Sequence, residues 1–259
     1  MDTGKMTALE FESVSYRYPS EEFDIIDGLS FRVERGSFHC IVGTSGCGKS
    51  TIFRLTNGLL ASKAGRILVE GAPIGGGRKQ YCGYMPQKDL LLPWRTVGEN
   101  VALPLEIRGG SSKAERRDRA EAALEDVGLA GCAGKMPHEL SGGMRQRAAF
   151  ARTMLTGSDL LLLDEPFSAL DFLTRITMQE WLLDQWQRHK KTILFITHDV
   201  EEAVFLSSSV LAVADTPIRS LLEVPVPADY PRDRSCLKRP EMTDLREGLI
   251  DLLRKQVKG

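Results

Sequence analysis

The chain lacks any long hydrophobic run. None of its apolar stretches reaches the roughly 18–20 residues that a helix needs to cross a bilayer. The N-terminal sequence MDTGKMTALEFESV does not place an apolar segment after a basic start, so it predicts no signal peptide. We therefore expect a soluble, intracellular protein whose membrane role, if it has one, comes through partners.

The chain also lacks paired cysteines and an excess charge. Its 34 basic and 35 acidic residues leave a formal net charge of -1, and no long basic block occurs, so composition predicts no nucleic-acid partner. An odd number of cysteines without metal-ligand spacing favours reduced thiols in the cytosol. The five cysteines stand at positions 40, 47, 82, 132 and 236.

What the sequence does contain is an alternation of short apolar segments with longer helical patterns. The strand-like segments are 29–33, 38–43, 66–71, 80–87, 159–166 and 192–199. The helical patterns are 50–60, 113–129 and 172–190. Such alternation predicts an α/β fold with a mainly parallel sheet covered on both sides.

The local sequence pattern divides the chain further. Helical patterns dominate from about 97 to 156, which predicts an inserted α-helical subdomain at about 95–157. The core domain is expected over 7–215. The tail, 216–259, carries five prolines up to Pro240 and then a charged amphipathic helix.

A glycine-rich loop follows the apolar segment 38–43. The pattern G-x-x-x-x-G-K-[ST] fits once, and its glycines let backbone N–H groups turn toward anionic oxygens. Lys49 can reach the β- and γ-phosphates of a nucleotide, and the Ser50 hydroxyl can ligate magnesium. For Cys47, a role as a small filler is favoured over redox control. The predicted phosphate cradle comprises Gly43, Thr44, Ser45, Gly46, Cys47, Gly48, Lys49, Ser50 and Thr51.

An acidic pair ends the leucine run 160–163. Asp164 and Glu165 are expected at the carboxyl edge of the sheet, beside the phosphate loop. Asp164 would hold magnesium through water, and Glu165 would take a proton from the attacking water. His198 ends another apolar strand, and its chemistry leaves contact with a γ-phosphate and a structural role equally open.

The segment LSGGMRQR, residues 140–147, resembles the signature of the ATP-binding-cassette (ABC) family, which is LSGGQ followed by basic residues. Met144 stands where glutamine is commonest, a replacement familiar among importers. The resemblance implies that Tyr18 stacks on adenine, that Gln87 links magnesium and water to a transport partner, and that His198 is the switch histidine. SALD, residues 168–171, resembles the D-loop.

This resemblance covers about 9–215 and implies a P-loop NTPase ABC cassette, with a RecA-like core, an antiparallel β subdomain and an inserted α-helical subdomain. In the family two cassettes dimerise head to tail, and each signature closes over the other's ATP. Ser141, Gly142 and Gly143 open a helix and would form that anion site. The implied cofactors are ATP and Mg²⁺. The implied catalytic residues are Glu165, His198 and Gln87, with Ser50, Gln87 and Asp164 at the metal.

Two classes of cassette fit these motifs: the motor of a membrane transporter and a soluble cassette of DNA repair or ribosomes. Positions 49 and 141 are only 92 apart and no long heptad run occurs, which favours transport. The segments 88–109 and 231–253 resemble the importer branch for nitrate, sulfonates and taurine. The segments 207–215 and 157–159 depart from that branch, which makes the assignment of the solute less specific.

The resemblance therefore implies the ATPase subunit of a bacterial importer at the cytoplasmic face of the inner membrane. It would energise uptake of a small anionic solute through a separate permease, supplied by an extracytoplasmic solute-binding protein. An apolar cluster follows Gln87, and it fits either core packing or a groove that grips a permease helix. The cluster consists of Leu90, Leu91, Leu92 and Trp94.

Overall fold

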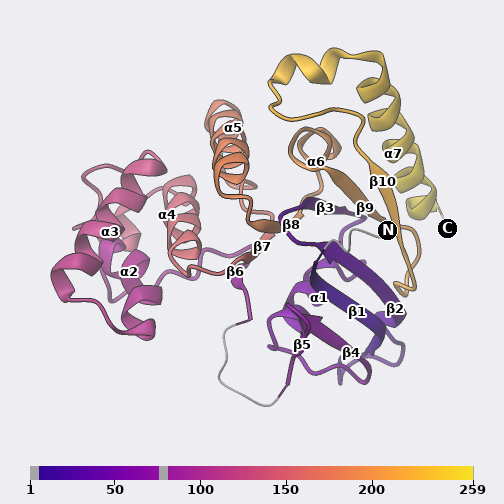
Figure 1. Ribbon diagram of the computed structural model, residues 1–259, viewed down its shortest axis with the longest axis horizontal. Helices are drawn as coiled ribbons and strands as arrows, with labels where there is room; N and C mark the ends of the chain where they lie inside the picture. The colour runs from indigo at the N-terminus through magenta and orange to yellow at the C-terminus, as the bar shows by residue number, and fades with distance from the viewer. Residues whose placement is uncertain (1–5, 76–80, 259) are drawn as a thin grey trace. The chain divides into compact units, whose positions relative to one another are not determined.

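The computed structural model describes residues 6–75 and 81–258. The chain forms two compact units, the first made of residues 1–81 and 182–259 and the second of residues 82–181. The relative placement of the units is not determined, so each is described by itself (Figure 1). The strand predicted at 80–87 begins at a residue that lies outside the described part.

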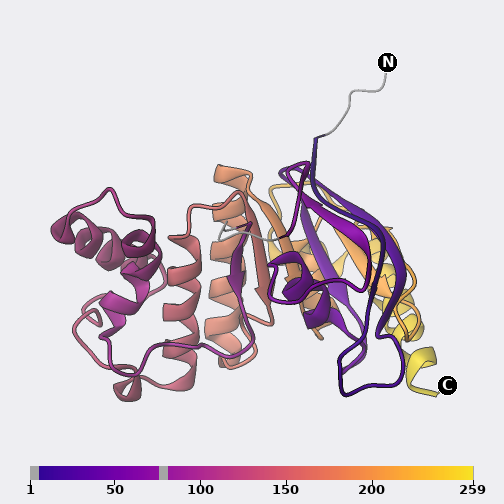
Figure 2. The same ribbon diagram turned by 90° about the horizontal axis from the view of Figure 1, so that it is seen from below.

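The first unit contains an antiparallel sheet in the order β2-β1-β4-β5, whose strands are labelled in Figure 1. Figure 2 shows the indigo and purple ribbons of this sheet from another side. Its strands are β1 Thr7–Tyr16, β2 Ile26–Glu34, β4 Ala64–Val69 and β5 Ala72–Pro73. The alternation of the sequence did not predict β1. Its pairing with β2 shifts register between Phe11 and Val14, and Ser13 there has a φ of +48°. Such a bulge breaks the two-residue period that marks a strand.

The same unit contains a second group of strands in the order β10-β9-β3-β8. Every residue of β3 Phe38–Val42, β8 Thr192–Ile196 and β9 Ser209–Val213 is buried. These strands run parallel, as the continuous apolar segments predicted. β10 Leu221–Pro225 is antiparallel to β9 and ends in a proline, which a strand at this end of the order tolerates. The sequence pattern of the proline-rich tail did not predict β10.

Four helical segments complete the first unit. They are α1 Lys49–Thr56, α6 Val200–Leu206, the 3₁₀ helix η2 Arg234–Lys238 and α7 Pro240–Lys258. α1 is shorter than the predicted 50–60, because Gly58 adopts a φ of +71° just beyond its end. The helix α5 Phe172–His189 crosses the boundary between the units, and its Trp186 packs against Phe38 with 5.8 Å between ring centroids.

The second unit joins a short parallel pair of strands to a group of helices. The strands are β6 Gly83–Met85 and β7 Leu160–Asp164. The helices are α2 Val97–Arg108, α3 Lys113–Asp126, the 3₁₀ helix η1 Pro137–Glu139 and α4 Gly142–Met154. α2, α3 and α4 pack together (Figure 1). Capping boxes start α2 and α3, so both begin where the local sequence specifies. The subdomain limits 95–157 stay a prediction.

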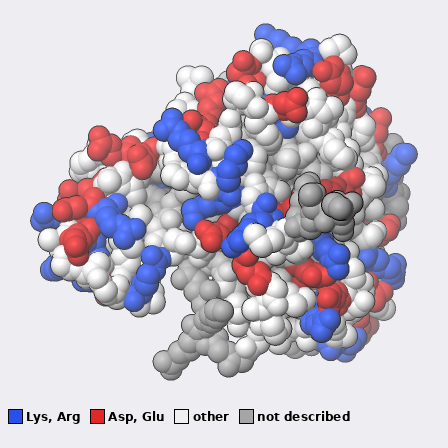
Figure 3. All heavy atoms as spheres, viewed as in Figure 1, with Lys and Arg blue, Asp and Glu red and all other residues white. Residues whose placement is uncertain are grey.

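Basic and acidic side chains are interspersed on the face of the molecule in Figure 3. This agrees with the near balance of 34 basic and 35 acidic residues in the sequence.

Candidate functional site

The predicted phosphate loop lies between β3 and α1 in the first unit. Gly46 and Gly48 have φ angles of +80° and +111°, which glycine adopts without strain. A Cβ at Gly48 would lie 2.7 Å from a methyl group of Ile25, so no larger residue fits there. Gly48 begins α1 with no side-chain cap, and an uncapped helix start of this kind offers its first N–H groups to an anion.

Lys49 is folded into this loop. Its side chain is buried, and Nζ donates to the carbonyl oxygens of Gly43 at 2.8 Å and Thr44 at 2.7 Å. The Cys47 sulfur lies 3.8 Å from the same nitrogen and is also buried. The ammonium group is thus held at the place where it can neutralise an anion in the loop, while Cys47 fills space beside it.

Tyr18 lies against the start of α1. Its hydroxyl is 3.1 Å from Thr51 Oγ1 and accepts a hydrogen bond from Arg54 at 3.2 Å. The ring of Tyr16 meets that of Tyr18 edge-on, with 5.0 Å between centroids. The structure therefore brings the aromatic residue predicted for adenine to the helix that follows the phosphate loop.

His198 belongs to the same sheet edge as the loop. β8 pairs with β3 in parallel, with Ile196 opposite Ile41, so both strands end side by side. Thr197 continues this arrangement by donating its backbone N–H to Ile41 O at 3.3 Å. His198 comes next and is exposed. The strand pattern thus brings the phosphate loop and His198 together.

The second unit places the acidic pair beside Gln87. β6 and β7 are parallel, with Met85 opposite Leu163, and the two chains leave at one edge. Asp164 ends β7 and is buried. The amide nitrogen of Gln87 donates to Glu165 Oε2 at 3.0 Å, so these two predicted residues are in direct contact.

Glu165 has an unusual backbone. Its φ is +49°, a conformation that costs a residue with a side chain about 1–3 kcal/mol and concentrates at functional sites. Gln146 on α4 supports it by donating to the Glu165 carbonyl at 3.2 Å. The same Gln146 accepts the Ala169 N–H at 2.9 Å. The loop after β7 is therefore fixed to the helix that carries the LSGG segment.

The LSGG segment forms an exposed helix start. The Ser141 hydroxyl caps α4 by accepting the Met144 N–H at 3.3 Å, and Ser141 and Gly142 are both exposed. A Cβ on Gly143 would lie 3.3 Å from the Ala169 carbonyl, so glycine allows the segment to pack on the SALD loop. The arrangement suits an anion that approaches from outside this unit.

The predicted site residues fall into two sets. Tyr18, the loop 43–51 and His198 lie in the first unit, whereas Gln87, the acidic pair and the segment 141–143 lie in the second. The structure brings residues together within each set.

Comparison with known proteins identifies the family. The ABC transporter family model matches residues 26–168. The chain is also 42% identical to the formylaminopyrimidine import ATP-binding protein ThiZ of Halalkalibacterium halodurans, over 97% of this chain and 95% of that protein. The chain belongs to the ABC transporter family. It is likewise 42% identical to the taurine import ATP-binding protein TauB of Rhizobium johnstonii, over 88% of each protein.

A solved structure of this family bears on the chemistry. The dimeric post-hydrolysis state of an ATP-binding cassette bound to ADP and Pi is similar to this ABC protein with a TM-score of 0.77. The two are 27% identical, over 85% of this chain and the whole of that one. The predicted ABC cassette fold is confirmed, and the chain is an ATPase that binds ATP. The expected place among the ATP-binding subunits of ABC importers is confirmed by the names of its relatives.

Sequence reasoning missed a set of contacts next to Gln87 in this ABC protein. Arg145 pairs with the Asp89 carboxylate at 2.9 Å, and Arg152 donates to the carbonyls of Asp89 at 2.7 Å and Leu90 at 2.8 Å. Both arginines lie on α4, seven residues apart and so on one face of the helix. That spacing after LSGG is the signal that could have revealed them.

Proposed function

We propose that this ABC ATPase energises the import of a small solute through a separate membrane permease. The observation that carries the proposal is its 42% identity, over almost the full length, to proteins named as import ATP-binding proteins. The contact between Gln87 and Glu165 supports it, because a partner that moves the segment around Gln87 would act on a carboxylate of the active site. The soluble non-transport alternative is not favoured by these relatives.

The proposed solute is a small anion of the nitrate, sulfonate or taurine type. The segments 88–109 and 231–253 support this class through their resemblance to that importer branch. One relative is named for taurine and another for formylaminopyrimidine, so a formylaminopyrimidine is the alternative cargo. The solute passes through the permease and not through this subunit. Uptake must therefore be measured in cells to distinguish the anion class from a formylaminopyrimidine.

In the proposed site, Tyr18 stacks on the adenine and the loop 43–51 binds the phosphates. Lys49 neutralises the β- and γ-phosphates, since a buried ammonium acts strongly on charge that it directly contacts. Glu165 accepts the proton of the attacking water at its carboxylate. His198 contacts the γ-phosphate from the adjacent strand end.

Magnesium fits the donors present. Mg²⁺ prefers oxygen ligands and is usually held by one or two carboxylates together with substrate phosphates. Ser50, Asp164 and the side-chain oxygen of Gln87 would supply such oxygens, while Gln87 uses its nitrogen for Glu165. Among the described residues no group of three His, Cys, Asp or Glu could hold a metal by itself. Bound magnesium would screen the phosphate charge during attack.

A second copy of the chain completes the proposed site. Ser141, Gly142 and Gly143 start a helix that is exposed at its N-terminus, and they would close over the nucleotide of the partner in a head-to-tail dimer. The similar post-hydrolysis cassette is dimeric, which supports this arrangement.

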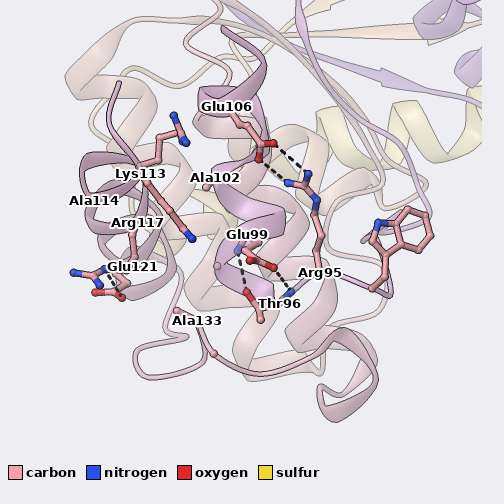
Figure 4. A pocket seen from close by; sticks show the side chains of 14 residues that line it. Arg95, Thr96, Glu99, Ala102, Glu106, Lys113, Ala114, Arg117, Glu121 and Ala133 are labelled. Carbon is pink, nitrogen blue, oxygen red and sulfur yellow. Dashed lines mark hydrogen bonds and ion pairs between the residues drawn. The ribbon is translucent and has the colours of Figure 1, made fainter. Parts of the chain in front are cut away.

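The proposed docking site for the permease is a pocket beside Trp94. Leu91 is buried, so part of the apolar cluster is core packing, but Trp94 remains 72% exposed. The pocket has a volume of about 890 Å³ and is also lined by Arg95 and Glu106, which pair at 2.6 Å (Figure 4). An exposed tryptophan beside a concave surface is typical of a protein-binding site.

No helix in residues 6–75 and 81–258 is long and apolar enough to span a membrane. We place the chain peripherally at the cytoplasmic face of the inner membrane. There a two-subunit permease would hold the dimer, and an extracytoplasmic binding protein would deliver the solute.

The test is uptake by cells that lack this chain. Deletion should abolish uptake of one solute among radiolabelled nitrate, an alkyl sulfonate, taurine and a formylaminopyrimidine. Wild-type chain should restore that uptake and Lys49→Ala should not. Loss of formylaminopyrimidine uptake alone would reject the anion class. Unchanged uptake of all four solutes would reject the proposed function.

A further inference from the structure

The C-terminal tail packs on α6, the helix that begins two residues after His198. Both η2 and α7 contact α6, and all of these elements belong to the first unit. α6 has only seven residues, too few for a helix to be stable by itself in water. Its position therefore depends on what holds its two ends.

The tail supplies the hydrogen-bond donors for three of the last four carbonyls of α6. The last four carbonyls of a helix have no partner within it, and here each has one. Ser207 covers Ala203 O with its N–H at 3.1 Å and its hydroxyl at 2.7 Å. Arg232 Nη1 lies 3.2 Å from Val204 O and 3.3 Å from Phe205 O. Tyr230 donates its hydroxyl to Leu206 O at 2.9 Å.

Several contacts hold the Arg232 side chain in this position. It is only 9% exposed, donates to Ser207 O at 2.7 Å, and is anchored to Ala228 O through Nε at 3.0 Å. Its guanidinium group lies 4.0 Å from the centre of the Tyr230 ring. A cation at the C-terminal end of a helix also complements the helix dipole. Burial lowers the pKa of Arg232, but an arginine remains charged in proteins.

The other end of α6 is tied to the residues on either side of His198. The Asp199 carboxylate caps the helix by accepting the N–H groups of Glu201 at 2.9 Å and Glu202 at 3.2 Å. Thr197 donates its hydroxyl to the Glu202 carboxylate and accepts the Asp199 N–H at 3.0 Å. The backbone of His198 is thus fixed to the first turn of α6.

Charge pairs hold the side of the same helix. Glu201 lies 3.8 Å from Arg234 and 3.4 Å from Arg246, which come from η2 and α7. The Arg234 guanidinium group lies 4.9 Å from the centre of the Phe205 ring. The tail therefore contacts α6 at its C-terminal end and along its length.

We propose that Arg232 and Tyr230 are positioning residues, which hold α6 so that His198 keeps its place at the nucleotide. The inference rests on the proposed role of His198 in hydrolysis. A loosened α6 would let His198 move, while the phosphate loop 43–51 would still bind ATP. The tail is then a part of the catalytic apparatus that touches neither nucleotide nor water.

The first test is Arg232→Gln in the full-length chain. A displacement of about 1 Å at a reacting group can cost up to a hundredfold in rate, so kcat for ATP should fall at least about tenfold. The Kd for ATP should stay within about twofold of wild type, because the phosphate loop is intact. The control Arg254→Gln removes an exposed arginine of α7 and should change neither value.

A double-mutant cycle separates positioning from general stability. Single-turnover hydrolysis is measured for Arg232→Gln, His198→Ala and the double variant. If Arg232 acts through His198, it should lose most of its effect when His198 is absent. Equal effects of Arg232→Gln in both backgrounds would overturn the inference. Full activity of His198→Ala would instead reject the proposed role of His198.

A spectroscopic readout needs no activity. The chain has four histidines, so ¹³C-labelled imidazole resonances can be assigned by single substitution. Arg232→Gln should shift or broaden the imidazole resonance of His198. The milder Tyr230→Phe, which removes only the hydroxyl hydrogen bond to Leu206 O, should have the same kind of effect. His138 and His189 should not change. Should Arg232→Gln fail to fold, Tyr230→Phe decides: an unmoved His198 signal with wild-type kcat would overturn the inference.

Discussion

At the scale of single residues, Glu165 combines features that mark it among the carboxylates of the chain. Its backbone has a φ of +49°, its carboxylate accepts the Gln87 amide, and its carbonyl accepts Gln146. Holding a strained backbone in this way costs stability, and proteins keep such strain mainly where position affects chemistry.

Substitution of Glu165 tests this interpretation. Glu165→Gln should bind ATP as wild type does but lose turnover at least about a hundredfold, because an amide cannot accept the proton of water. It should also accumulate as an ATP-bound dimer in size-exclusion chromatography. Glu247→Gln, an exposed change on α7, serves as the control. Normal turnover in Glu165→Gln would remove this residue from the base role.

Cysteine burial leads to a pH prediction. All five cysteines are free and buried, and burial raises the pKa of Cys82 from 9.0 to about 12. The folded state therefore favours the thiol. Its contribution to stability is complete below about pH 9 and is lost as the pH rises toward 12, because the unfolded chain releases its proton first.

Two measurements test whether stability falls as the pH rises. The Tm should fall as the pH rises from 8 to 10, and it should fall less in Cys82→Ala. Because the thiolate is the reactive form, Cys82 should resist iodoacetamide at pH 8.5 in the folded chain and react after unfolding in urea. Equally fast labelling of folded and unfolded chains would contradict the burial argument.

At the scale of elements, α4 connects several parts of the second unit. Its N-terminus carries Ser141, Gln146 holds the loop after β7, and Arg145 and Arg152 hold the segment that follows Gln87. A shift of α4 would therefore change the signature segment and the Gln87 segment together. The local pattern places Arg145 and Arg152 on one face of α4, but it could not identify their acceptors, because these lie 56 to 63 positions away in the sequence.

The proposed docking site for the permease, the pocket beside Trp94, is tested by substitutions on α2 and in the segment before it. Trp94→Ala should leave ATP binding unchanged and weaken capture of the permease by at least about tenfold, as expected when a central aromatic is lost. The control Ile107→Ala removes an exposed apolar residue that lies on α2 itself, and it should leave capture unchanged. The measurement is co-purification of the permease with the tagged chain from detergent extract. Unchanged capture by Trp94→Ala would reject the groove.

Elements differed in how well the sequence predicted them. β3, β7 and β8 were predicted because they are continuous apolar runs, buried at every residue. β1 and β10 were missed because a bulge breaks the pattern of one and prolines surround the other. In both cases pairing with a neighbouring strand outweighed the local pattern.

At the scale of the whole molecule, the main question is whether two copies share each ATP site. The proposed site takes Lys49 from one chain and Ser141 from the other, so a chain altered at one position can be complemented by a chain altered at the other. Lys49→Ala and Ser141→Arg should each be inactive. Mixed dimers of the two variants contain one intact site and one doubly altered site.

The mixture should recover about a quarter of wild-type activity, since half of the dimers are mixed and each has one of two sites intact. Two affinity tags purified in sequence isolate the mixed dimer and confirm that it forms. ATP hydrolysis by that fraction is then measured. Absence of hydrolysis in verified mixed dimers would argue against a shared site.

The chemistry of the phosphate loop was determined by the sequence alone. Glycines at 46 and 48 set the backbone, and Lys49 follows them directly, so the necessary groups lie within a few residues of each other. The motifs in order were likewise enough to indicate the family. Only the tertiary structure decided which part of the chain the tail contacts. Arg232 meets carbonyls 25 to 28 positions earlier in the chain, and no local pattern encodes a contact between a side chain and a distant backbone.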